Sequence, residues 1–437
     1  MATVPTLVRP ERSRGTPDTS GLGARQAALR MLDSVLRQGR TLDSAAQDSR
    51  GLAPADQGLA IAIAGEALRR LPDLDALIDG ATQRPLPDDS KARMVLRLAL
   101  AQKIGLGTPD HALVATALPL VDGGPRRLVH GVLGTLLRKG VPLLEAPRLP
   151  AAVEMRWAHA WGEETVHAAR RQIAKRPPLD LSFAEDAAAQ AYVAEHGGVS
   201  LAPRHVRLPE SSAVPELAGF GEGGWWVQDL AASLPARLIP GLIPGHASEV
   251  LDLCAAPGGK TMQLAAAGHR VTSVDASKNR LARIRENLQR TKLSASLVPV
   301  DALGWEPGRA FDAILLDAPC SATGTFRRHP EVLYRARPPV IAGSAELQTK
   351  LLNRAAAWLK PGGALVYSVC SLEYDEGEAV VTAFLAANPD FRLDRPADLP
   401  AFVILDASGR LRILPGLLED QGGLDGFFAA RLVRNGD

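Results

Sequence analysis

Two of the three cysteines in this chain are placed where a reactive thiol pair would be expected. Cys320 and Cys370 lie 50 positions apart, and a serine follows each. A thiolate is a strong nucleophile, and a neighbouring cation lowers its pKa. One buried cysteine is ordinarily a small hydrophobic residue. Two thiols that each follow an apolar run favour a reactive pair facing one crevice.

A pyrimidine ring is a substrate whose methylation requires such a thiol. Carbon 5 of the ring is a poor nucleophile until a thiolate adds to carbon 6, after which carbon 5 can attack an activated methyl group. Asp317 stands three residues before Cys320, where it can hold the edge of the ring. Amino-directed methyltransferases need no thiol and carry an aromatic residue in this motif, which Asp317-Ala318-Pro319-Cys320 lacks.

A glycine-containing turn at residues 254–261, CAAPGGKT, follows another apolar run. Glycine permits a tight turn and a close approach of backbone to ligand. The turn is not a phosphate-binding P-loop, because Cys254 stands where that motif requires its first glycine, and no Gly-x-Gly-x-x-Gly pattern occurs. A plain turn between a strand and a helix remains open at this point.

Three acids at the ends of successive predicted strands favour a nucleoside ligand. Asp275 lies about 20 residues beyond the turn, where a carboxylate accepts ribose hydroxyls. Asp301 is placed to meet an adenine amino group, and Asp317 ends a further strand. Acids that bind ribose, without a phosphate-binding loop, indicate S-adenosylmethionine.

The elements that position these residues alternate between strand and helix. Short apolar runs occur at 248–254, 269–276, 295–302, 311–319 and 363–371, and helical stretches at 259–268, 278–291 and 344–363 separate them. This alternation predicts an α/β domain with a parallel sheet over residues 223–437. Such sheets bind ligands at the carboxyl ends of their strands.

The residues before 223 divide into three further segments. We expect a disordered tail at 1–20, an all-α domain at 21–142 and a small α+β linker domain at 148–222. In the all-α segment, apolar residues recur at helical spacing, for example along 25–39, and Gly140 is a predicted helix end. Trp225 and Trp226 are expected to pack at a domain seam rather than to stack on a base.

Composition excludes several classes of protein. Fifty basic and 48 acidic residues give a net charge of +2, so any nucleic-acid footprint must be local. Three cysteines without a Cys-x-x-Cys pair indicate neither a disulfide scaffold nor a zinc site. No secretory signal and no apolar run long enough to span a membrane occur. We therefore expect a cytoplasmic protein without metal.

The motifs together resemble a known family. CAAPGGKT, VDASKNRL, LDAPCSATGTFRRHPE, LKPGGALVYSVCS and DGFFAARL are similar to motifs of the Nop/Sun family of RNA cytosine-5 methyltransferases. The helical region, with GEALRR and VLRLALAQKI, resembles a NusB-like RNA-binding domain. The resemblance implies a doubly wound, Rossmann-like methyltransferase domain, S-adenosyl-L-methionine as cofactor, and small-subunit (16S) ribosomal RNA as partner, with the protein acting as a monomer.

The resemblance also implies a role for each motif residue. Cys370 is the expected nucleophile, and Cys320 is expected to help release the product; sequence spacing alone does not choose between the two. The expected cofactor-binding residues are Cys254, Ala255, Ala256, Pro257, Gly258, Gly259, Lys260, Asp275, Asp301 and Asp317. Arg327 and Arg328, which follow the Pro-Cys motif, are the candidate contacts to RNA phosphates. Methylation of another structured RNA such as tRNA, or of DNA, and a non-catalytic role in RNA binding and assembly remain as alternatives.

Overall fold

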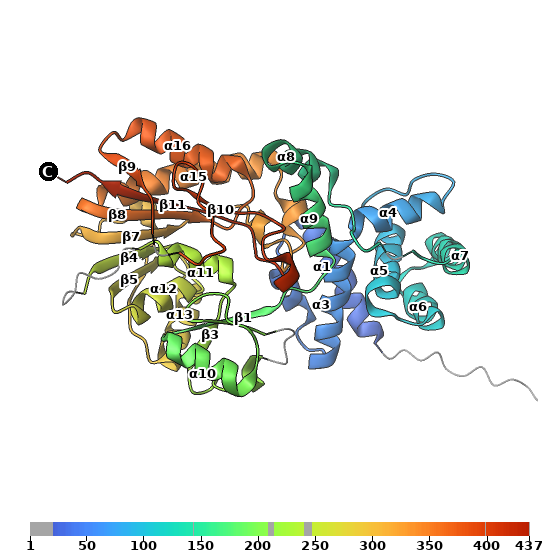
Figure 1. The fold of residues 1–437 in the computed structure, drawn as a ribbon. Helices are drawn as coiled ribbons and strands as arrows, with labels where there is room; N and C mark the ends of the chain where they lie inside the picture. The colour runs from blue at the N-terminus through green and yellow to red at the C-terminus, as the bar shows by residue number, and fades with distance from the viewer. Residues whose placement is uncertain (1–20, 143, 209–213, 240–246, 398, 437) are drawn as a thin grey trace, which may run out of the picture. The chain divides into compact units, whose positions relative to one another are not determined.

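The computed structural model describes residues 21–142, 144–208, 214–239, 247–397 and 399–436 (Figure 1). These residues form two compact units, one within 1–143 and one within 144–437. The segment 1–20, predicted to be a disordered tail, lies outside the described residues.

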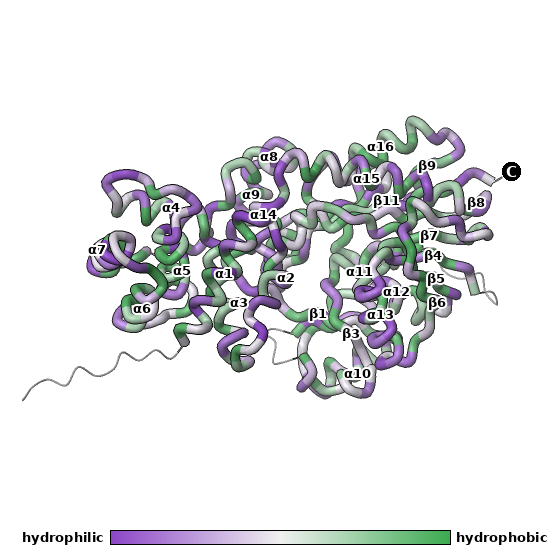
Figure 2. Tube along the Cα trace, turned by 180° about the vertical axis from the view of Figure 1, so that it is seen from behind, coloured by the Kyte–Doolittle hydropathy of each residue, from purple (hydrophilic) through white to green (hydrophobic). Residues whose placement is uncertain are grey.

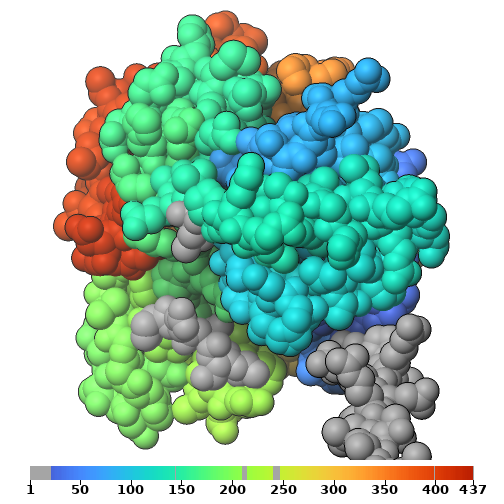
Figure 3. Space-filling model, turned by 90° about the vertical axis from the view of Figure 1, so that its right-hand side faces the viewer, coloured from blue at the N-terminus to red at the C-terminus, as the bar shows by residue number. Residues whose placement is uncertain are grey.

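The first unit is built from α-helices, as its apolar periodicity predicts. Its helices are α1 (Leu22–Gln38), α2 (Leu42–Ala46), α3 (Pro54–Arg69), α4 (Leu71–Gly80), α5 (Lys91–Leu106), α6 (Asp110–Ala117) and α7 (Gly123–Lys139). Gly140 caps α7 as expected. In the space-filling view, the face of this unit turned to the viewer is made mainly by the blue to teal segments from α4 to α7 (Figure 3).

Helix α5 is the centre of the first unit. It packs against α1, α3, α4, α6 and α7, and its residues 92–102 are all buried. Burial of Arg93 and Arg97 is offset by ion pairs, because Asp75 accepts from both guanidinium groups at 3.0 Å and 2.7 Å. Asp79 adds a further contact to Arg93 at 2.6 Å. A buried helix with paired charges thus fixes the bundle.

The second unit begins with two helices and a small sheet. The helices α8 (Ala151–Trp161) and α9 (Glu163–Ile173) are separated at Gly162, whose φ is 84°. Strands β1 (Leu179–Phe183), β2 (His205–Leu208) and β3 (Trp225–Val227) form an antiparallel sheet in the order β2-β1-β3, beside α10 (Asp186–His196). Trp225 packs in the core of this sheet, and Trp226 packs against Ala255 and Ile284 of the following domain. Trp226 therefore packs at a seam, as predicted, whereas Trp225 belongs to the core of the small sheet, so the prediction was wrong for that residue.

The large sheet has the predicted doubly wound architecture. Its strands are β4 (Glu249–Leu253), β5 (Arg270–Asp275), β6 (Ser296–Pro299), β7 (Phe311–Asp317), β8 (Leu359–Val369), β9 (Phe391–Asp394), β10 (Leu411–Ile413) and β11 (Phe427–Arg434). Their order is β10-β11-β8-β7-β4-β5-β6, with β9 paired to β11. Strands β4 to β8 are mutually parallel, and β11 runs antiparallel to β8.

Helices cover both faces of this sheet (Figure 1). One face carries α11 (Leu230–Arg237), α12 (Gly259–Ala266) and α13 (Lys278–Thr291), and the other carries α15 (Pro338–Ala357) and α16 (Glu378–Ala387); the short α14 spans Val332–Arg335. Figure 2 shows hydrophobic stretches along the central strands, as expected for parallel strands buried on both faces, and others along the helices.

One predicted helix is displaced along the sequence. Helical character was expected over 344–363, whereas α15 starts at Pro338 and ends at Ala357. Two prolines occupy its first turn, where their missing N–H groups cost nothing. The helix ends early because Leu359 already pairs with Phe311 as the first residue of β8. The prediction of the boundary was wrong because pairing with a distant strand decides it.

Candidate active site

The site lies where the strand order reverses. Strand β4 has β5 on one side and β7 on the other, and the crevice at the carboxyl ends of such strands is the usual ligand site of this fold. The turn after β4 leads into α12, with Cys254 at φ 59° and Gly258 at φ 102°. A Cβ at Gly258 would also lie 3.0 Å from the side chain of Ile284. Only glycine suits this position, as the motif predicts.

The acids that were expected at strand ends differ in their surroundings. Asp275 ends β5 and is buried, with its carboxylate accepting from the backbone N–H of Ala256 at 3.3 Å and of Ser277 at 2.9 Å. Asp301 lies beyond the end of β6, is exposed, and accepts from the N–H of Leu303 at 3.0 Å. Asp275 thus ties the predicted cofactor turn to the neighbouring strand, and Asp301 stands at the rim.

Lys260 and Asp317 form an ion pair across the switch point. The Lys260 Nζ donates to Asp317 Oδ2 at 2.8 Å, and Ser368 Oγ donates to Asp317 Oδ1 at 3.0 Å. Burial by itself lowers the pKa of Lys260, but the charges of Asp317 and a Cys370 thiolate outweigh it and raise that pKa. Lys260 is therefore positively charged at neutral pH, and its charge interacts favourably with a thiolate at Cys370. Sequence reasoning assigned Lys260 to the cofactor only and missed this position.

A buried acid lies beneath this ion pair. Asp252 is fully buried in β4, and burial is the main reason why its pKa rises to about 7. Its Oδ2 accepts from Thr261 Oγ1 at 2.5 Å, whereas its Oδ1 has no partner among the described residues. Asp252, Lys260 and Asp317 all line one cavity of about 500 Å³, together with Ala255, Pro257 and Gly259.

These residues fit S-adenosylmethionine. The cofactor carries two cationic groups, a sulfonium and an ammonium, and the cavity wall offers the carboxylates of Asp252 and Asp317. The unpartnered Asp252 oxygen in particular is a buried acceptor that a cationic group would satisfy. Ala255, Pro257 and Gly259 line the same cavity, so the predicted cofactor turn and these acids share it.

The two cysteines meet, although 50 residues separate them. Cys320 Sγ and Cys370 Sγ are 3.5 Å apart, because β7 and β8 are parallel neighbours with Asp317 opposite Ser368. The hydrogen bond that Cys320 shares with Cys370, together with burial, raises the pKa of Cys320 well above its ordinary value. Burial, reinforced by the charge of Asp317, raises the pKa of Cys254 to about 12. Cys320 and Cys254 therefore remain thiols at neutral pH.

Glycine permits the backbone contacts that close this part of the site. Gly324 donates from its N–H to the carbonyl of Cys370 at 3.0 Å, and its own carbonyl accepts from the N–H of Gly426 at 2.8 Å. A Cβ on Gly324 would lie 2.0 Å from the Gly426 oxygen. The loop that bears Cys320 is therefore joined by backbone hydrogen bonds to the segments after β8 and before β11.

The two candidate RNA-binding arginines are engaged by carboxylates. Arg327 is 1% exposed, and Asp229 and Asp425 accept from its guanidinium at 3.2 Å and 3.0 Å. Arg328 is partly exposed, lines the 500 Å³ cavity and shares the same two acids at 2.8 Å and 3.3 Å. Contact with RNA stays a prediction for both residues, and only Arg328 has a side chain accessible from the cavity.

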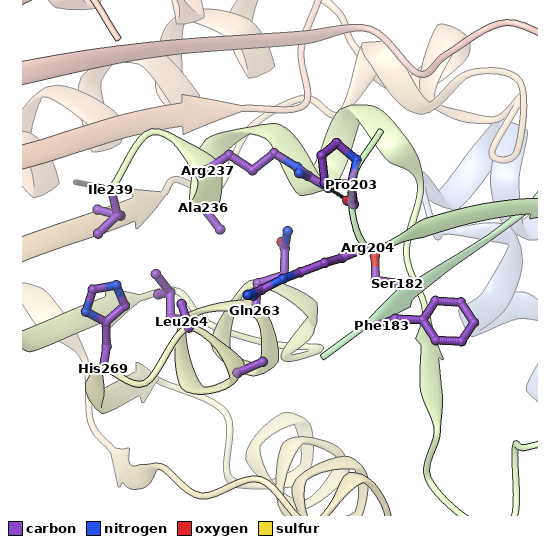
Figure 4. Close-up of a pocket in the computed structure, with 12 residues that line it drawn as sticks. Ser182, Phe183, Pro203, Arg204, Ala236, Arg237, Ile239, Gln263, Leu264 and His269 are labelled. Atoms are coloured by element: carbon purple, nitrogen blue, oxygen red, sulfur yellow. Dashed lines mark hydrogen bonds between the residues drawn. The ribbon is translucent and has the colours of Figure 1, made fainter. Parts of the chain in front are cut away.

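A second cavity, of about 230 Å³, lies away from this site (Figure 4). It is lined by the ends of α11 and α12 and by His269, which precedes β5, so it faces the amino ends of the strands. Arg237 donates to the carbonyl of Pro203 at 2.7 Å, and Arg204 extends along the cavity. The carboxyl ends of helices attract cations, so the ends of α11 and α12 explain the presence of arginine here, and no bound ligand is needed to explain it. None of the predicted site residues lies in this cavity.

Within the described residues, no three His, Cys, Asp or Glu side chains are grouped so as to hold a metal ion. Across the same part of the chain, every helix is too short or too polar to span a bilayer.

The Rossmann-like sheet, the glycine turn and the acids around it define an S-adenosylmethionine-dependent methyltransferase. Residues 241–433 match the family described as 16S rRNA methyltransferase RsmB/F, and residues 22–138 match the NusB family. The chain is 35% identical to ribosomal RNA small subunit methyltransferase B of Xanthomonas campestris pv. campestris, over 95% of this chain and 98% of the relative. It is also 35% identical to the protein of that name from Pseudomonas putida, over 94% and 99%. The chain therefore belongs to the RsmB/F family of 16S rRNA methyltransferases.

Solved structures show the same fold at lower sequence identity. The crystal structure of PH0851 covers 94% of this chain, and 98% of that chain is matched, with a TM-score of 0.70 and 22% identity. NSun6 from Pyrococcus horikoshii with SFG covers 66% of this chain, with 99% of that chain matched, a TM-score of 0.56 and 20% identity. The predicted all-α and Rossmann-like architecture is thus confirmed.

Proposed function

We propose that this chain transfers a methyl group to carbon 5 of a cytosine in 16S rRNA, through a covalent bond between Cys370 and carbon 6. The observation that supports this proposal is the 3.5 Å separation of the Cys320 and Cys370 sulfurs beside the Lys260–Asp317 ion pair. A methyltransferase acting on an amino or hydroxyl group needs no thiol at the reacting end.

Lys260 and Asp317 prepare the addition step. The Lys260 ammonium stabilises the thiolate of Cys370, which forms its bond to carbon 6 of the cytosine and moves the ring electrons toward carbon 5. Asp317 retains lone pairs beyond its two hydrogen bonds and can hold the protonated edge of the ring. S-adenosylmethionine, when bound, supplies the methyl group that carbon 5 attacks.

Cys320 acts in the release step. After methyl transfer, carbon 5 gives its proton to a base such as solvent water. The electrons of that bond re-form the double bond between carbons 5 and 6, and the carbon–sulfur electrons return to Cys370 as a thiolate. Cys320 is a protonated thiol that can form a hydrogen bond to the departing thiolate, because its sulfur is the immediate neighbour of Cys370. We propose that this contact favours elimination and restores the free enzyme.

The two thiols can be tested separately. We expect Cys370→Ala to abolish both methylation and any RNA adduct that survives denaturation. We expect Cys320→Ala to accumulate that adduct, because elimination stalls. The substrate is ribosomal RNA from a strain that lacks the gene, and RNA from the parent strain, already methylated, is the control. Exchange of the two behaviours between the variants would reverse the assigned roles.

The same RNA preparations test the target. Mass spectrometry of small-subunit RNA from the deletion strain should show the loss of one 5-methylcytosine, and the purified enzyme with S-adenosylmethionine should restore it. Restoration only in tRNA would support the alternative substrate, and assembly defects without any lost methyl group would support a binding factor.

We further propose that the enzyme acts in the cytoplasm as a monomer. Light scattering of the purified chain, with and without RNA, tests the oligomeric state.

A further inference from the structure

A buried carboxylate joins the two loops that bear the reactive cysteines. Glu376 is 0% exposed and lies six residues after Cys370. Its hydrogen bonds reach the serine that follows each cysteine, Ser321 and Ser371. We propose that Glu376 is a positioning residue that holds the Cys320 and Cys370 thiols within reach of each other. Its importance for catalysis rests on the two-thiol function proposed above.

The contacts to the Cys320 loop involve both carboxylate oxygens. The backbone N–H of Ser321 donates to Glu376 Oε1 at 2.8 Å, and the Ser321 hydroxyl donates to Oε2 at 2.5 Å. Gln348 of α15 donates to the carbonyl of Pro319 at 2.9 Å and approaches Glu376 Oε1 at 3.4 Å. The residues on either side of Cys320 are therefore fixed to one carboxylate and one helix.

The contacts to the Cys370 loop converge on the same oxygen. The Ser371 hydroxyl donates to Glu376 Oε2, and Ser371 Oγ lies 3.2 Å from Ser321 Oγ. The N–H of Glu373 donates to Ser371 Oγ at 3.1 Å, which orients that hydroxyl. The backbone of Glu376 is fixed in turn, because the Tyr367 hydroxyl of β8 donates to its carbonyl at 2.5 Å.

All donors to the Glu376 carboxylate are neutral. The described part of the chain places no lysine, arginine or histidine in an ion pair with it. A buried carboxylate is tolerated only when hydrogen bonds replace its hydration. Because the donors come from both loops, separation of the loops would leave the charge partly unsatisfied. The energetic cost of that separation keeps the cysteines together, since each is the direct chain neighbour of a donor serine.

The other glutamates near the Cys370 loop have a different environment. Glu373 is also buried, but it accepts from Arg156 at 3.0 Å and from the Trp157 indole at 3.1 Å, both on α8. Glu378 accepts from Arg412 at 2.9 Å. Among the described residues, neither carboxylate forms a hydrogen bond with the loop of Cys320. Glu373 is thus a matched control, buried and charged on the same loop but bonded elsewhere.

The test measures the thiol geometry without RNA. Diamide takes the two thiol hydrogens and leaves a disulfide, so its rate of joining Cys320 to Cys370 reports how often the two sulfurs meet. Peptide mass mapping follows that bond in the wild type, Glu376→Gln and Glu373→Gln. The glutamine side chain would place an NH2 donor against the Ser321 and Ser371 hydroxyls, which donate to the carboxylate in the wild type. We therefore expect cross-linking to slow at least about tenfold. Glu373→Gln is expected to stay within about twofold of the wild type.

The milder variant Ser321→Ala covers the case in which Glu376→Gln does not fold. It removes one donor and leaves the carboxylate in place, so we expect a smaller slowing of cross-linking, about threefold. Tryptophan fluorescence of each variant checks that the native fold is retained. Cross-linking in folded Glu376→Gln or Ser321→Ala at the wild-type rate, or equal slowing in Glu373→Gln, would overturn the proposal.

A second readout relates the geometry to catalysis. We expect Glu376→Gln to lower kcat and to accumulate the RNA adduct partway toward the Cys320→Ala level, with an unchanged dissociation constant for S-adenosylmethionine. A general loss of structure would instead weaken cofactor binding as well. Slower cross-linking in Glu376→Gln, with no RNA adduct in any variant, would contradict the proposed covalent mechanism but support the positioning role of Glu376. Failure of the positioning proposal can therefore be distinguished from failure of the proposed function.

Discussion

Replacement of Asp252 by asparagine should change how the stability of the second unit depends on pH. Asp252 is fully buried, and burial raises its pKa to about 7, with the nearby Asp317 charge adding to the effect and the Thr261 hydrogen bond opposing it. The ordinary value is 3.8. Between pH 4 and 7 the folded chain therefore retains a proton that the unfolded chain has lost. Stability from this group falls as pH rises through that window and is constant above it.

The size of the effect follows from the shift. A change of one pKa unit corresponds to about 1.36 kcal/mol. The rise of the Asp252 pKa from 3.8 to about 7 therefore lowers the free energy of unfolding by about 4 kcal/mol above pH 7. About 3 kcal/mol of that cost develops between pH 5 and pH 8. Asparagine keeps the shape and can still accept from Thr261, but it has no charge to bury. The free energy of unfolding of Asp252→Asn should therefore rise relative to the wild type by about 3 kcal/mol between these pH values.

Urea unfolding followed by tryptophan fluorescence measures this difference. All six tryptophans lie within residues 144–437, so the signal reports the second unit alone. Both proteins are measured at pH 5 and pH 8, and contributions from the other titrating groups cancel in the comparison. A constant difference between Asp252→Asn and the wild type at the two pH values would refute the reasoning, because it would mean that Asp252 ionises normally in the fold.

Three further predictions concern charged side chains. Lys260→Met should lower the single-turnover methylation rate about 100-fold, because the Cys370 thiolate loses its cation; a fall below threefold would contradict that role. Asp275→Ala should weaken S-adenosylmethionine binding about tenfold by calorimetry, and unchanged affinity would remove the ribose assignment. Asp180→Asn should cost about 3 kcal/mol in urea unfolding at pH 7, because it breaks a buried ion pair. Burial by itself raises the pKa of Asp180, but hydrogen bonds from Arg207 outweigh it and lower that pKa. The stabilisation from the Asp180 carboxylate should therefore be lost as the pH falls below about 4 in the wild type, and Asp180→Asn should not show this loss.

The elements of the methyltransferase fold follow from the sequence because buried parallel strands are nearly continuous apolar runs. The predicted runs ending near Leu253, Asp275 and Asp317 correspond to β4, β5 and β7. The motif order then places the glycine turn and both cysteines at one edge. The start of α15 could not be located this way, since the preceding segment, residues 338–343, has weak helical periodicity and is set by packing.

Contacts between residues far apart in sequence were beyond prediction. The pair Arg327 and Arg328 reads as a basic patch, yet Asp229 and Asp425, almost 100 positions away on either side, engage both side chains. The carboxylate of Glu376 reaches Ser321 across 55 positions. Such pairings depend on which loops the sheet brings together, and a single sequence carries no local signal of them.

The place of β11 in the sheet has a consequence for synthesis of the chain. This strand is the last of the described strands in sequence, yet it pairs with β8, β9 and β10 in the interior of the sheet. While a ribosome is still translating residues 427–434, β8 has one edge of unpaired backbone groups, and exposed edges are prone to pair with other chains. The edge of the strand that precedes Cys370 is therefore paired only after residues 427–434 have been synthesised, and a chaperone that shields that edge until then would favour a good yield of active enzyme.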